Sequence, residues 1–340
     1  MTILSVETSC DETSVAITHD GTRVLSNVVL SQINTHALYG GVVPEIASRE
    51  HVAGITRIFD QAIAEAGITK EAIDLVAVTQ GPGLIGSLLV GINAAKAFAY
   101  ANDIPIIGVH HIVGHIYANA IEQPLEFPLL ALIISGGHTE LIYMPEHMRF
   151  ERLGKTQDDA IGEAYDKVAR LLDLGYPGGP KLDQLAQEGS PSIPMPNVAL
   201  DGYDFSYSGL KSHVINTLHN MRQRREVMDP RDVASSFQTA AFKQIFTQTQ
   251  KAIETLRPKQ LVIAGGVAGN QYLRTHMHTV WDVPIQIPRL EYCMDNAAMI
   301  GVAAYYQWHQ NPKGWAFDFN GHARMDFIQK AYTEGEEVIR

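Results

Sequence analysis

The two halves of the chain carry the same order of strands, loops and helices. Residues 3–21 and 128–147 each begin with an apolar strand, followed by a polar turn rich in small and hydroxyl residues and by a second strand. Residues 74–107 and 259–287 agree more closely, because each has a buried strand, a glycine loop, a helix and a strand that opens with Asp-Ile-Pro or Asp-Val-Pro. Generic α/β sequences could agree this far by chance, but the shared order of elements favours a duplicated unit.

A duplicated unit of this kind predicts an α/β fold with two similar lobes, mixed sheets flanked by helices, and a central cleft. We expect a first lobe over residues 1–125 and a second lobe over residues 126–340. The segment from about 154 to 231 has no counterpart in the first half and is interpreted as an insertion around the cleft. The pattern leaves open whether the final helices pack on the first lobe.

The acidic composition argues against a chain that binds nucleic acid by itself. Its formal net charge is −11 at pH 7, whereas a free-standing nucleic-acid binder normally carries a basic surface. The local exception is the cluster of Arg222, Arg224 and Arg225. A short cluster of this kind is more often a solvated helix face, so a role in binding nucleic acid is a hypothesis.

The start of the chain and its cysteine content indicate a cytoplasmic protein. The first ten residues are typical of a core strand rather than a signal peptide, because no basic segment precedes the apolar run. No stretch reaches the roughly eighteen uncharged apolar residues of a membrane span, so no membrane partner is expected. Cys10 and Cys293 fit a reducing compartment, although a single disulfide between them stays open.

His111 and His115 are spaced as metal ligands on one helix. They lie four residues apart in HIVGH, so their imidazoles share a helix face with Cβ atoms about 5–6 Å apart. The corresponding helix of the second half carries Asp295 near its start, and pseudo-symmetry would bring the two helix starts together across the cleft. Two imidazoles and a carboxylate suit Fe²⁺, Zn²⁺ or Mn²⁺ with open positions for a ligand. The alternative is that Asp295 caps its helix and the histidines are ordinary surface residues.

Glycine-rich turns are the candidate ligand-binding loops. Residues 135–138, Ser-Gly-Gly-His, follow a buried strand, and the two glycines would let backbone N–H groups approach a phosphate or acyl oxygen. An ordinary hairpin turn would look the same. Residues 265–270 join a strand to a helix without the dinucleotide spacing G-x-G-x-x-G, and Asn270 would either cap that helix or reach a ligand. Residues 81–86 are the first-half counterpart and could be structural alone.

Acidic residues gather in the insertion, at Asp158, Asp159, Glu163 and Asp166 on one expected helix and at Asp183 beyond it. By their spacing Asp159, Glu163 and Asp166 share a helical face. A solvated face is the ordinary explanation, whereas the glycine pair that follows, Gly178 and Gly179, favours a ligand contact. Asp11, in the first polar turn, is likewise either solvated or placed at the cleft.

Several common catalytic motifs are missing from the sequence, which has no Walker A motif, no G-x-S-x-G and no H-E-x-x-H. In HIVGH, the position that a metalloprotease fills with glutamate is Ile112. No general base would stand beside the histidines there, so a zinc protease is a poor interpretation.

Ten short motifs together resemble the bacterial TsaD family of tRNA N6-adenosine threonylcarbamoyltransferases. In chain order they are ETSCDET, GGVVPEIASREH, GPGLIGSLLVG, HHIVGH, SGGHTEL, IGEAYDKVARLL, YPGGP, FSYSGLK, AGGVAGN and CMDNAAMI. The resemblance runs from residue 3 to about residue 325, and the combination of motifs is highly specific. It implies an ASKHA fold, the actin-like architecture with two similar lobes that the repeat already predicts.

The resemblance also implies a reaction and a set of site residues. The family transfers a threonylcarbamoyl group from threonylcarbamoyl-AMP to N6 of the adenosine beside the anticodon, in tRNAs that read codons beginning with A. By motif the metal ligands are His111, His115 and Asp295, with Fe²⁺ the expected ion and Zn²⁺ an alternative. The implied substrate contacts are Ile134, Ser135, Gly136, Gly137, His138, Asp166, Gly179, Asp183 and Asn270.

Partners and mechanism follow from the same resemblance. Bacterial members work with a shorter ASKHA paralogue, TsaB, and with a P-loop ATPase, TsaE, and the adenylate or a nucleotide is expected in the cleft. The attacking amine is weakly nucleophilic, so the reaction mainly requires positioning and the removal of one proton. Backbone donors of the turn at 135–138 would stabilise the developing oxyanion, and Asp11 is our candidate proton acceptor.

Two rival functions share the predicted fold. A small-molecule kinase of the ASKHA superfamily would bind ATP, form a phosphorylated product and need no tRNA. A non-catalytic, nucleotide-gated interaction module would resemble the chaperones of the superfamily, but the chain has no large appended substrate domain.

Overall fold

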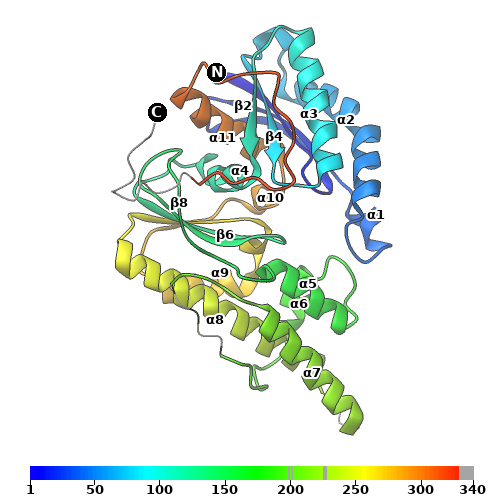
Figure 1. Ribbon diagram of the computed structural model, residues 1–340, viewed down its shortest axis with the longest axis vertical. Coiled ribbons are helices and arrows are strands. Elements are labelled where there is room, and N and C mark those ends of the chain that lie inside the picture. The colour runs from blue at the N-terminus through cyan, green and yellow to red at the C-terminus, as the bar shows by residue number, and fades with distance from the viewer. Residues whose placement is uncertain (198–199, 201, 225–227, 329–340) are drawn as a thin grey trace, which may run out of the picture.

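The computed structural model describes residues 1–197, 200, 202–224 and 228–328, which contain two five-stranded sheets of the same topology (Figure 1). The first sheet has the order β3 (Arg23–Ser31), β2 (Glu12–His19), β1 (Thr2–Glu7), β4 (Leu75–Gly81), β5 (Ile106–His110). The second has the order β8 (Glu151–Lys155), β7 (Thr139–Met144), β6 (Leu129–Ile134), β9 (Gln260–Ala264), β10 (Ile285–Gln286). In each sheet three antiparallel strands are followed by two that pair in parallel. The predicted α/β fold with two similar lobes is therefore confirmed.

The outer face of the first sheet is covered by α2 (Pro44–Ala66) and α3 (Ile85–Ala101), which also pack on each other. Pro44 opens α2 at a position where its missing N–H costs no hydrogen bond. Gly67 ends the helix with φ 65, a left-handed conformation that glycine adopts without strain. The apolar side chains between these helices and the sheet form one of three cores.

The outer layer of the second lobe is larger because it includes the insertion. Its long helix is α8 (Pro230–Leu256), which contacts β6 and α9 (Gln271–Val280). Between β8 and α8 lie α5 (Ile161–Leu171), α6 (Gly179–Gln187) and α7 (Ser208–Arg224), for which the first lobe offers only the short α1 (Ile33–Ala37). In Figure 1, α7 extends away from the body of the molecule.

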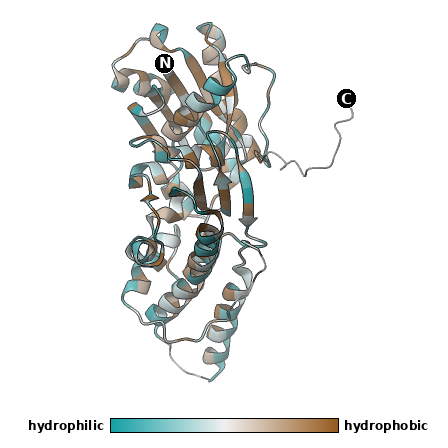
Figure 2. Ribbon diagram, turned by 90° about the vertical axis from the view of Figure 1, so that its left-hand side faces the viewer, coloured by the Kyte–Doolittle hydropathy of each residue, from teal (hydrophilic) through white to brown (hydrophobic). Residues whose placement is uncertain are grey.

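A central layer of helices lies between the two sheets. It comprises α4 (His111–Tyr117), the 3₁₀ turn η2 (Ala118–Ala120), α10 (Leu290–Cys293) and α11 (Ala297–Gln310). Helix α4 contacts β6 and β9 of the second sheet, whereas α11 contacts β1 and β2 of the first, and the two helices pack on each other. Their shared core includes Ile116, Ile133 and Ile300, all fully buried. The final helix thus packs on the first lobe, and in Figure 2 the strands on either side are predominantly hydrophobic.

The last described segment, residues 311–328, runs back across the first lobe and ends beside the second (Figure 1). Lys96 donates to the carbonyl of Phe319 on the first lobe. At the far end His110 donates to the carbonyl of Met325 at 3.0 Å, and Arg152 of β8 pairs with Asp326 at 3.0 Å. The segment therefore links β5 of the first sheet to β8 of the second.

Two further expectations concern the membrane and the cysteines. Among the described helices, none combines the length and the apolar character needed to cross a membrane. Cys10 and Cys293 are both free thiols. The disulfide that the sequence left open is therefore not formed.

Candidate metal centre and substrate-binding loops

The central helices bring the three predicted metal ligands together. His111 and His115 lie on one face of α4, which begins at His111 where the chain leaves β5. Asp295 lies two residues before α11, and the side chain that caps this helix is Asn296, which accepts from the N–H of Met299. Because Asn296 performs the capping, Asp295 is free to face α4, and the capping alternative for Asp295 is ruled out.

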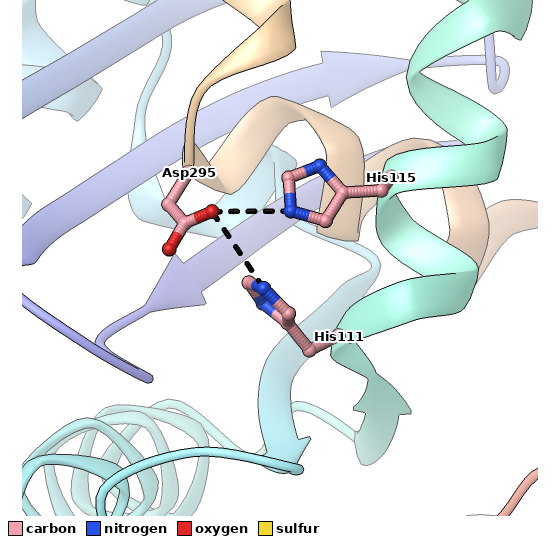
Figure 3. Close-up of side chains that lie close together, drawn as sticks. All are labelled: His111, His115 and Asp295. Atoms are coloured by element: carbon pink, nitrogen blue, oxygen red, sulfur yellow. Dashed lines mark ion pairs between the residues drawn. The ribbon is translucent and has the colours of Figure 1, made fainter. Parts of the chain in front are cut away.

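The three side chains converge on one small volume (Figure 3). Oδ1 of Asp295 lies 3.1 Å from Nε2 of His115 and 3.6 Å from Nε2 of His111, and one ligand atom from each residue lies within 4.8 Å of the others. The two imidazole rings are nearly perpendicular, with centroids 4.7 Å apart. Both histidines are buried, and the Asp295 side chain is only 23 % exposed.

These residues fit a divalent metal ion in spacing and in chemistry. Ligand atoms bound to one ion at about 2.1 Å lie roughly 3.0–3.5 Å from each other, close to the separations of 3.1 and 3.6 Å. His115 adds a second observation, since neither of its buried ring nitrogens has a hydrogen-bond partner among the described residues. Its Nε2 is near Asp295 without being aligned to bond it, as expected of two ligands that face a common third atom. Two imidazoles and one carboxylate form the donor set of facial-triad metal sites.

A buried glutamate that the sequence analysis missed orients one of these ligands. Glu7, at the end of β1, is fully buried and its Oε2 lies 3.0 Å from Nδ1 of His111. Thr79 donates to the same oxygen at 2.6 Å, and the N–H of Ser9 donates to Oε1. With Nδ1 held by Glu7, the Nε2 of His111 is left to face Asp295, which is how carboxylates outside the ligand shell usually set the tautomer of a metal-binding histidine. Only the tertiary structure, in which β1 pairs with β4 and Glu7 meets the first residue of α4, reveals this contact.

Mutual attraction sets the protonation states of the centre. Burial alone would raise the pKa of Asp295, but His111 and then His115 outweigh it and hold that pKa well below its ordinary value. Burial would likewise lower the pKa of His111, but Asp295 and Glu7 raise it to about 9. In the metal-free protein His111 is therefore protonated at neutral pH.

We expect metal affinity to rise with pH between about 7 and 9. The proton on His111 must leave before its Nε2 can bind a metal, so each pH unit below the pKa of about 9 costs roughly tenfold in apparent affinity. Above that pH the dependence should flatten. Competition titrations with Zn²⁺ and a chelator at pH 7, 8 and 9, corrected for the protonation of the chelator, measure this directly. An affinity that does not change with pH would contradict the pairing of His111 with Asp295 and Glu7.

The predicted Ser-Gly-Gly-His turn joins β6 to β7. The N–H of Ser135 donates to the carbonyl of His138 at 2.9 Å, and the N–H of His138 donates to the Ser135 hydroxyl at 3.1 Å. Gly136 and Gly137 form the exposed tip, and none of the hydrogen bonds among the described residues uses their N–H groups. Burial, followed by the charges of His111 and His115, lowers the pKa of His138 to about 3. The turn is thus close to the metal ligands and offers two unused backbone donors.

The second glycine loop lies directly against this turn. Gly265 has φ 94, and a Cβ there would stand 2.4 Å from the carbonyl oxygen of Ile134 at the end of β6, so only glycine fits. A Cβ on Gly266 would meet the sulfur of Met294, the neighbour of Asp295. The 3₁₀ turn η3 (Gly266–Gly269) that follows leads into α9. The loop therefore packs against Ile134 on one side and against Met294, the residue before Asp295, on the other.

Asn270 and Asp183 stabilise the start of α9. Asn270 caps the helix by accepting from the N–H of Leu273 at 3.0 Å and donates to Gln238 at 3.3 Å. Asp183 of α6 accepts from the N–H of Gln271 at 2.8 Å through Oδ2, while its buried Oδ1 has no partner among the described residues. The sequence left open whether Asn270 caps the helix or reaches a ligand, and the structure shows the cap.

Asp166 performs a similar task for the turn before α6. Its Oδ1 accepts from the N–H groups of Gly178 and Gly179, at 2.9 and 3.0 Å. Tyr176, in the same turn, has its pKa raised by burial and then by Asp11 and Asp166. Tyr176 was not predicted, and its phenol lies close to one acidic residue from each lobe.

The first polar turn, between β1 and β2, places two buried carboxyl groups near the metal centre. Asp11 and Glu12 are both 7 % exposed. Burial, then the charges of Asp295 and Asp11, raise the pKa of Glu12 to about 9. Glu12 therefore carries a proton at neutral pH, and its Oε1 accepts a hydrogen bond from the hydroxyl of Ser31 at 3.2 Å.

The predicted acidic face of the insertion is wrong in one respect. Helix α5 begins only after Asp159, so this residue does not share a helical face with Glu163 and Asp166. Its carboxylate instead pairs with Lys167 at 2.8 Å and with Lys211 at 2.7 Å. Residues 157–159 form a bend before the helix, which the spacing of acidic residues alone could not reveal.

Comparison with solved structures identifies the fold. HypF from T. kodakarensis matches with a TM-score of 0.66 at 15 % identity, over 91 % of this chain and 48 % of that chain. Component A of the (R)-2-hydroxyglutaryl-CoA dehydratase of Acidaminococcus fermentans matches with a TM-score of 0.53 at 15 % identity, over 90 % and 98 % of the two chains. At this identity the likeness concerns the fold alone, and it confirms the ASKHA architecture.

Comparison of sequences identifies the family. The family model described as "TsaD: tRNA N6-adenosine threonylcarbamoyltransferase" matches residues 23–302. The protein of that name from Staphylococcus haemolyticus is 54 % identical over 337 residues, 98 % of each chain. The one from Bacillus anthracis is 54 % identical over 317 residues, 92 % of each chain. This chain belongs to the TsaD family of tRNA N6-adenosine threonylcarbamoyltransferases.

Proposed function

We propose that this protein transfers the threonylcarbamoyl group of threonylcarbamoyl-AMP to N6 of the adenosine beside the anticodon, in tRNAs that read codons beginning with A. The observation that carries the proposal is the 54 % identity, over 98 % of both chains, to a threonylcarbamoyltransferase of that name. The convergence of His111, His115 and Asp295 with two glycine loops supports it independently.

The metal ligands and the turn at 135–138 have separate tasks in this proposal. His111, His115 and Asp295 would hold one divalent ion, for which we favour Fe²⁺ over Zn²⁺, and a bound ion there would hold a phosphate or polarise the acyl carbonyl. The N–H groups of Gly136 and Gly137 would donate to the carbonyl oxygen as negative charge develops on it, and their exposed position, without a hydrogen-bond partner among the described residues, supports this role. Preorganised donors of this kind require no rearrangement during the reaction.

The proton of the attacking amine is assigned to Asp11. This residue lies in the first polar turn and is 7 % exposed, and its charge is among those that raise the pKa of Tyr176. Glu12, its neighbour, has a pKa of about 9 and so already holds a proton at neutral pH, which removes it as a competing acceptor. The leaving group is AMP, the carbamoyl carbon gains the bond to N6, and Asp11 takes the proton.

The remaining predicted contact residues would support the loops that bind the adenylate. Asp166, Gly179, Asp183 and Asn270 hold the turn before α6 and the start of α9 in place. We propose that the free carboxylate oxygens of Asp166 and Asp183 face the hydroxyl groups of the nucleotide. Since the attacking amine is weak, orientation of both substrates supplies most of the rate.

Reconstitution tests the function. The purified protein is incubated with tRNA, threonylcarbamoyl-AMP and proteins of the TsaB and TsaE types, which we propose as partners, and the nucleosides are analysed by mass spectrometry. Threonylcarbamoyladenosine should form only when all substrates are present. A phosphorylated small molecule formed from ATP without tRNA would show the rival kinase activity instead, and nucleotide binding without any product would favour the non-catalytic module.

We expect the arginine cluster at the end of α7 to contribute to tRNA binding. Arg222 and the exposed Arg224 belong to α7, while Arg225 lies outside the described residues. The rest of the chain is acidic, so these cations are candidates for contacts with phosphate. Changing all three to alanine should weaken tRNA binding and reduce the slope of log affinity against log salt by about 0.7–0.9 per lost contact. An unchanged slope in filter-binding assays would mean that the cluster is only solvated.

A further inference from the structure

A series of hydrogen-bonded, buried polar side chains, here called the relay, connects the first polar turn to the start of α2. His36 and His51 are fully buried, and Gln32 is 4 % exposed. The N–H of Val43 donates to Nδ1 of His36 at 3.3 Å, and Nε2 of His36 lies 3.0 Å from Oε1 of Gln32. Nε2 of Gln32 lies 3.3 Å from Nδ1 of His51, whose Nε2 lies 2.9 Å from the carbonyl of Cys10.

The groups at the two ends of the relay determine the direction of every hydrogen bond within it. The N–H of Val43 can only donate, so Nδ1 of His36 accepts and its Nε2 carries the proton given to Gln32. The amide nitrogen of Gln32 then donates to Nδ1 of His51, and Nε2 of His51 donates to the carbonyl, which can only accept. Both imidazoles are therefore neutral and protonated on Nε2. Burial, which lowers the pKa of His51, agrees with the neutral form.

One end of the relay is the first polar turn, which carries Asp11, the proposed proton acceptor. His51 holds the carbonyl of Cys10, and the N–H of Gln32 holds the next carbonyl, that of Asp11, at 3.1 Å. The hydroxyl of Thr13 lies 2.7 Å from Nδ1 of His51 and donates to it, sharing this acceptor with the amide of Gln32. Two successive peptide groups on either side of the Asp11 Cα are thus fixed by groups from outside the turn, which sets the direction of the Cα–Cβ bond from which the Asp11 carboxylate extends.

The other end of the relay lies against the second lobe. Val43 immediately precedes α2, and the N–H of Gly41 donates to the carbonyl of His36 at 3.3 Å. Arg170 of α5 donates to the carbonyl of Gly40 at 2.6 Å. Residues 40–43 therefore take part in both contacts. Val43 donates the first hydrogen bond of the relay, and Gly40 accepts from Arg170 of the second lobe.

We propose that His51, with Gln32 and His36, is a positioning residue for the turn of Asp11, and that this relay couples the turn to the contact between Arg170 and Gly40. The inference rests on the proposed function, because it assigns the relay to the geometry of the same reaction. Misplacement of a reacting group by about 1 Å can cost on the order of 100-fold in rate, so loss of the relay should act on kcat. None of the metal ligands is a member of the relay.

The first experiment compares three variants in the reconstituted assay. His51→Leu keeps much of the volume but none of the hydrogen bonds of the imidazole, and should lower kcat by on the order of 100-fold with metal content per folded protein unchanged and KM for the adenylate changed by less than about threefold. His51→Gln can accept from Gln32 and donate to the carbonyl of Cys10, and should recover most of kcat. His19→Leu is the matched control, since His19 ends β2 far from the turn and is partly exposed, and its kcat should equal that of the wild type.

Non-additivity tests the coupling to the second lobe. If the relay transmits the Arg170 contact, the effects of Arg170→Ala and His51→Leu on kcat should not multiply in the double variant. Effects that multiply would overturn the coupling. A folded His51→Leu protein with wild-type kcat would overturn the positioning role, and an inactive wild type would instead count against the proposed function.

If the His51→Leu variant does not fold, a measurement on the wild-type protein tests the direction of the hydrogen bonds in the relay. Long-range ¹H–¹⁵N spectra of protein labelled only at histidine report which ring nitrogen carries the proton. At pH 7.5, His36 and His51 should both be neutral with the proton on Nε2. A proton on Nδ1 of either ring would reverse the direction of the relay and overturn the inference.

Discussion

We expect His111→Ala and Asp295→Ala each to lose stoichiometric metal binding, with a drop in affinity of more than about 100-fold, and to lose transferase activity with it. Loss of a partner outside the ligand shell typically costs 10–100-fold in metal affinity, so loss of a direct ligand should exceed that range. The effect should be equal from either lobe, because one ligand comes from α4 and the other from the residues before α11. Elemental analysis of the purified variants and activity assays measure both quantities.

Wild-type protein treated with a chelator is the matched control for these variants. It should lose activity to the same extent and regain it when metal is returned, whereas neither variant should regain it. The Asp295 variant also leaves the raised pKa of His111 without its largest favourable contribution, so it should bind metal with a weaker dependence on pH. Full metal occupancy in both variants would rule out the site.

Gly137→Ala should reduce nucleotide affinity by at least about tenfold, or roughly 1.4 kcal/mol, while leaving the fold intact. Gly137 is exposed, its φ is outside the left-handed region, and a Cβ there would have nothing within 4 Å. The change in the free energy of unfolding should therefore be within about 0.5 kcal/mol, smaller than the cost of about 1 kcal/mol often seen when a turn requires glycine. The methyl group would instead occupy the space in which a ligand oxygen meets the N–H of this residue.

Thermal melts and calorimetric titration with an AMP or ATP analogue, on the same preparation, separate the two effects. Gly209→Ala is the matched control, since it also adds a methyl group where no atom of the protein lies within 4 Å, but in α7. It should bind nucleotide as the wild type does. If Gly137→Ala melts earlier yet binds with unchanged affinity, the turn does not cradle the adenylate.

Much of the architecture could be predicted because it depends on local patterns. Periodic apolar runs, glycine loops and the paired Asp-x-Pro strand starts recur in the two halves, and the two sheets have the same strand order. The i, i+4 spacing of His111 and His115 is a property of any helix, so their common face followed from the sequence. Asp295 followed only because the repeat aligned its helix with theirs.

Prediction failed where a residue acts through a partner that is distant in sequence. Glu7 holds His111 across 104 residues, and His51 holds the carbonyl of Cys10 across 41. A buried glutamate or histidine has no periodic signal that distinguishes its partner. The acidic face failed for a related reason, because spacing implied a helix through Asp159, while the chain bends there and the Asp159 carboxylate pairs with Lys211, 52 residues away.

The sequence alone determined which side chains could form the centre, since residue type, helical spacing and duplication are all present in the linear chain. Only the tertiary structure decided how they are oriented and protonated. The packing of α4 and α11 between the two sheets brings Asp295 to the histidines, and burial there removes the water that would otherwise screen their charges. Hydrogen-bond direction, tautomer and pKa depend on the atoms around each group in space, and those atoms come from both lobes.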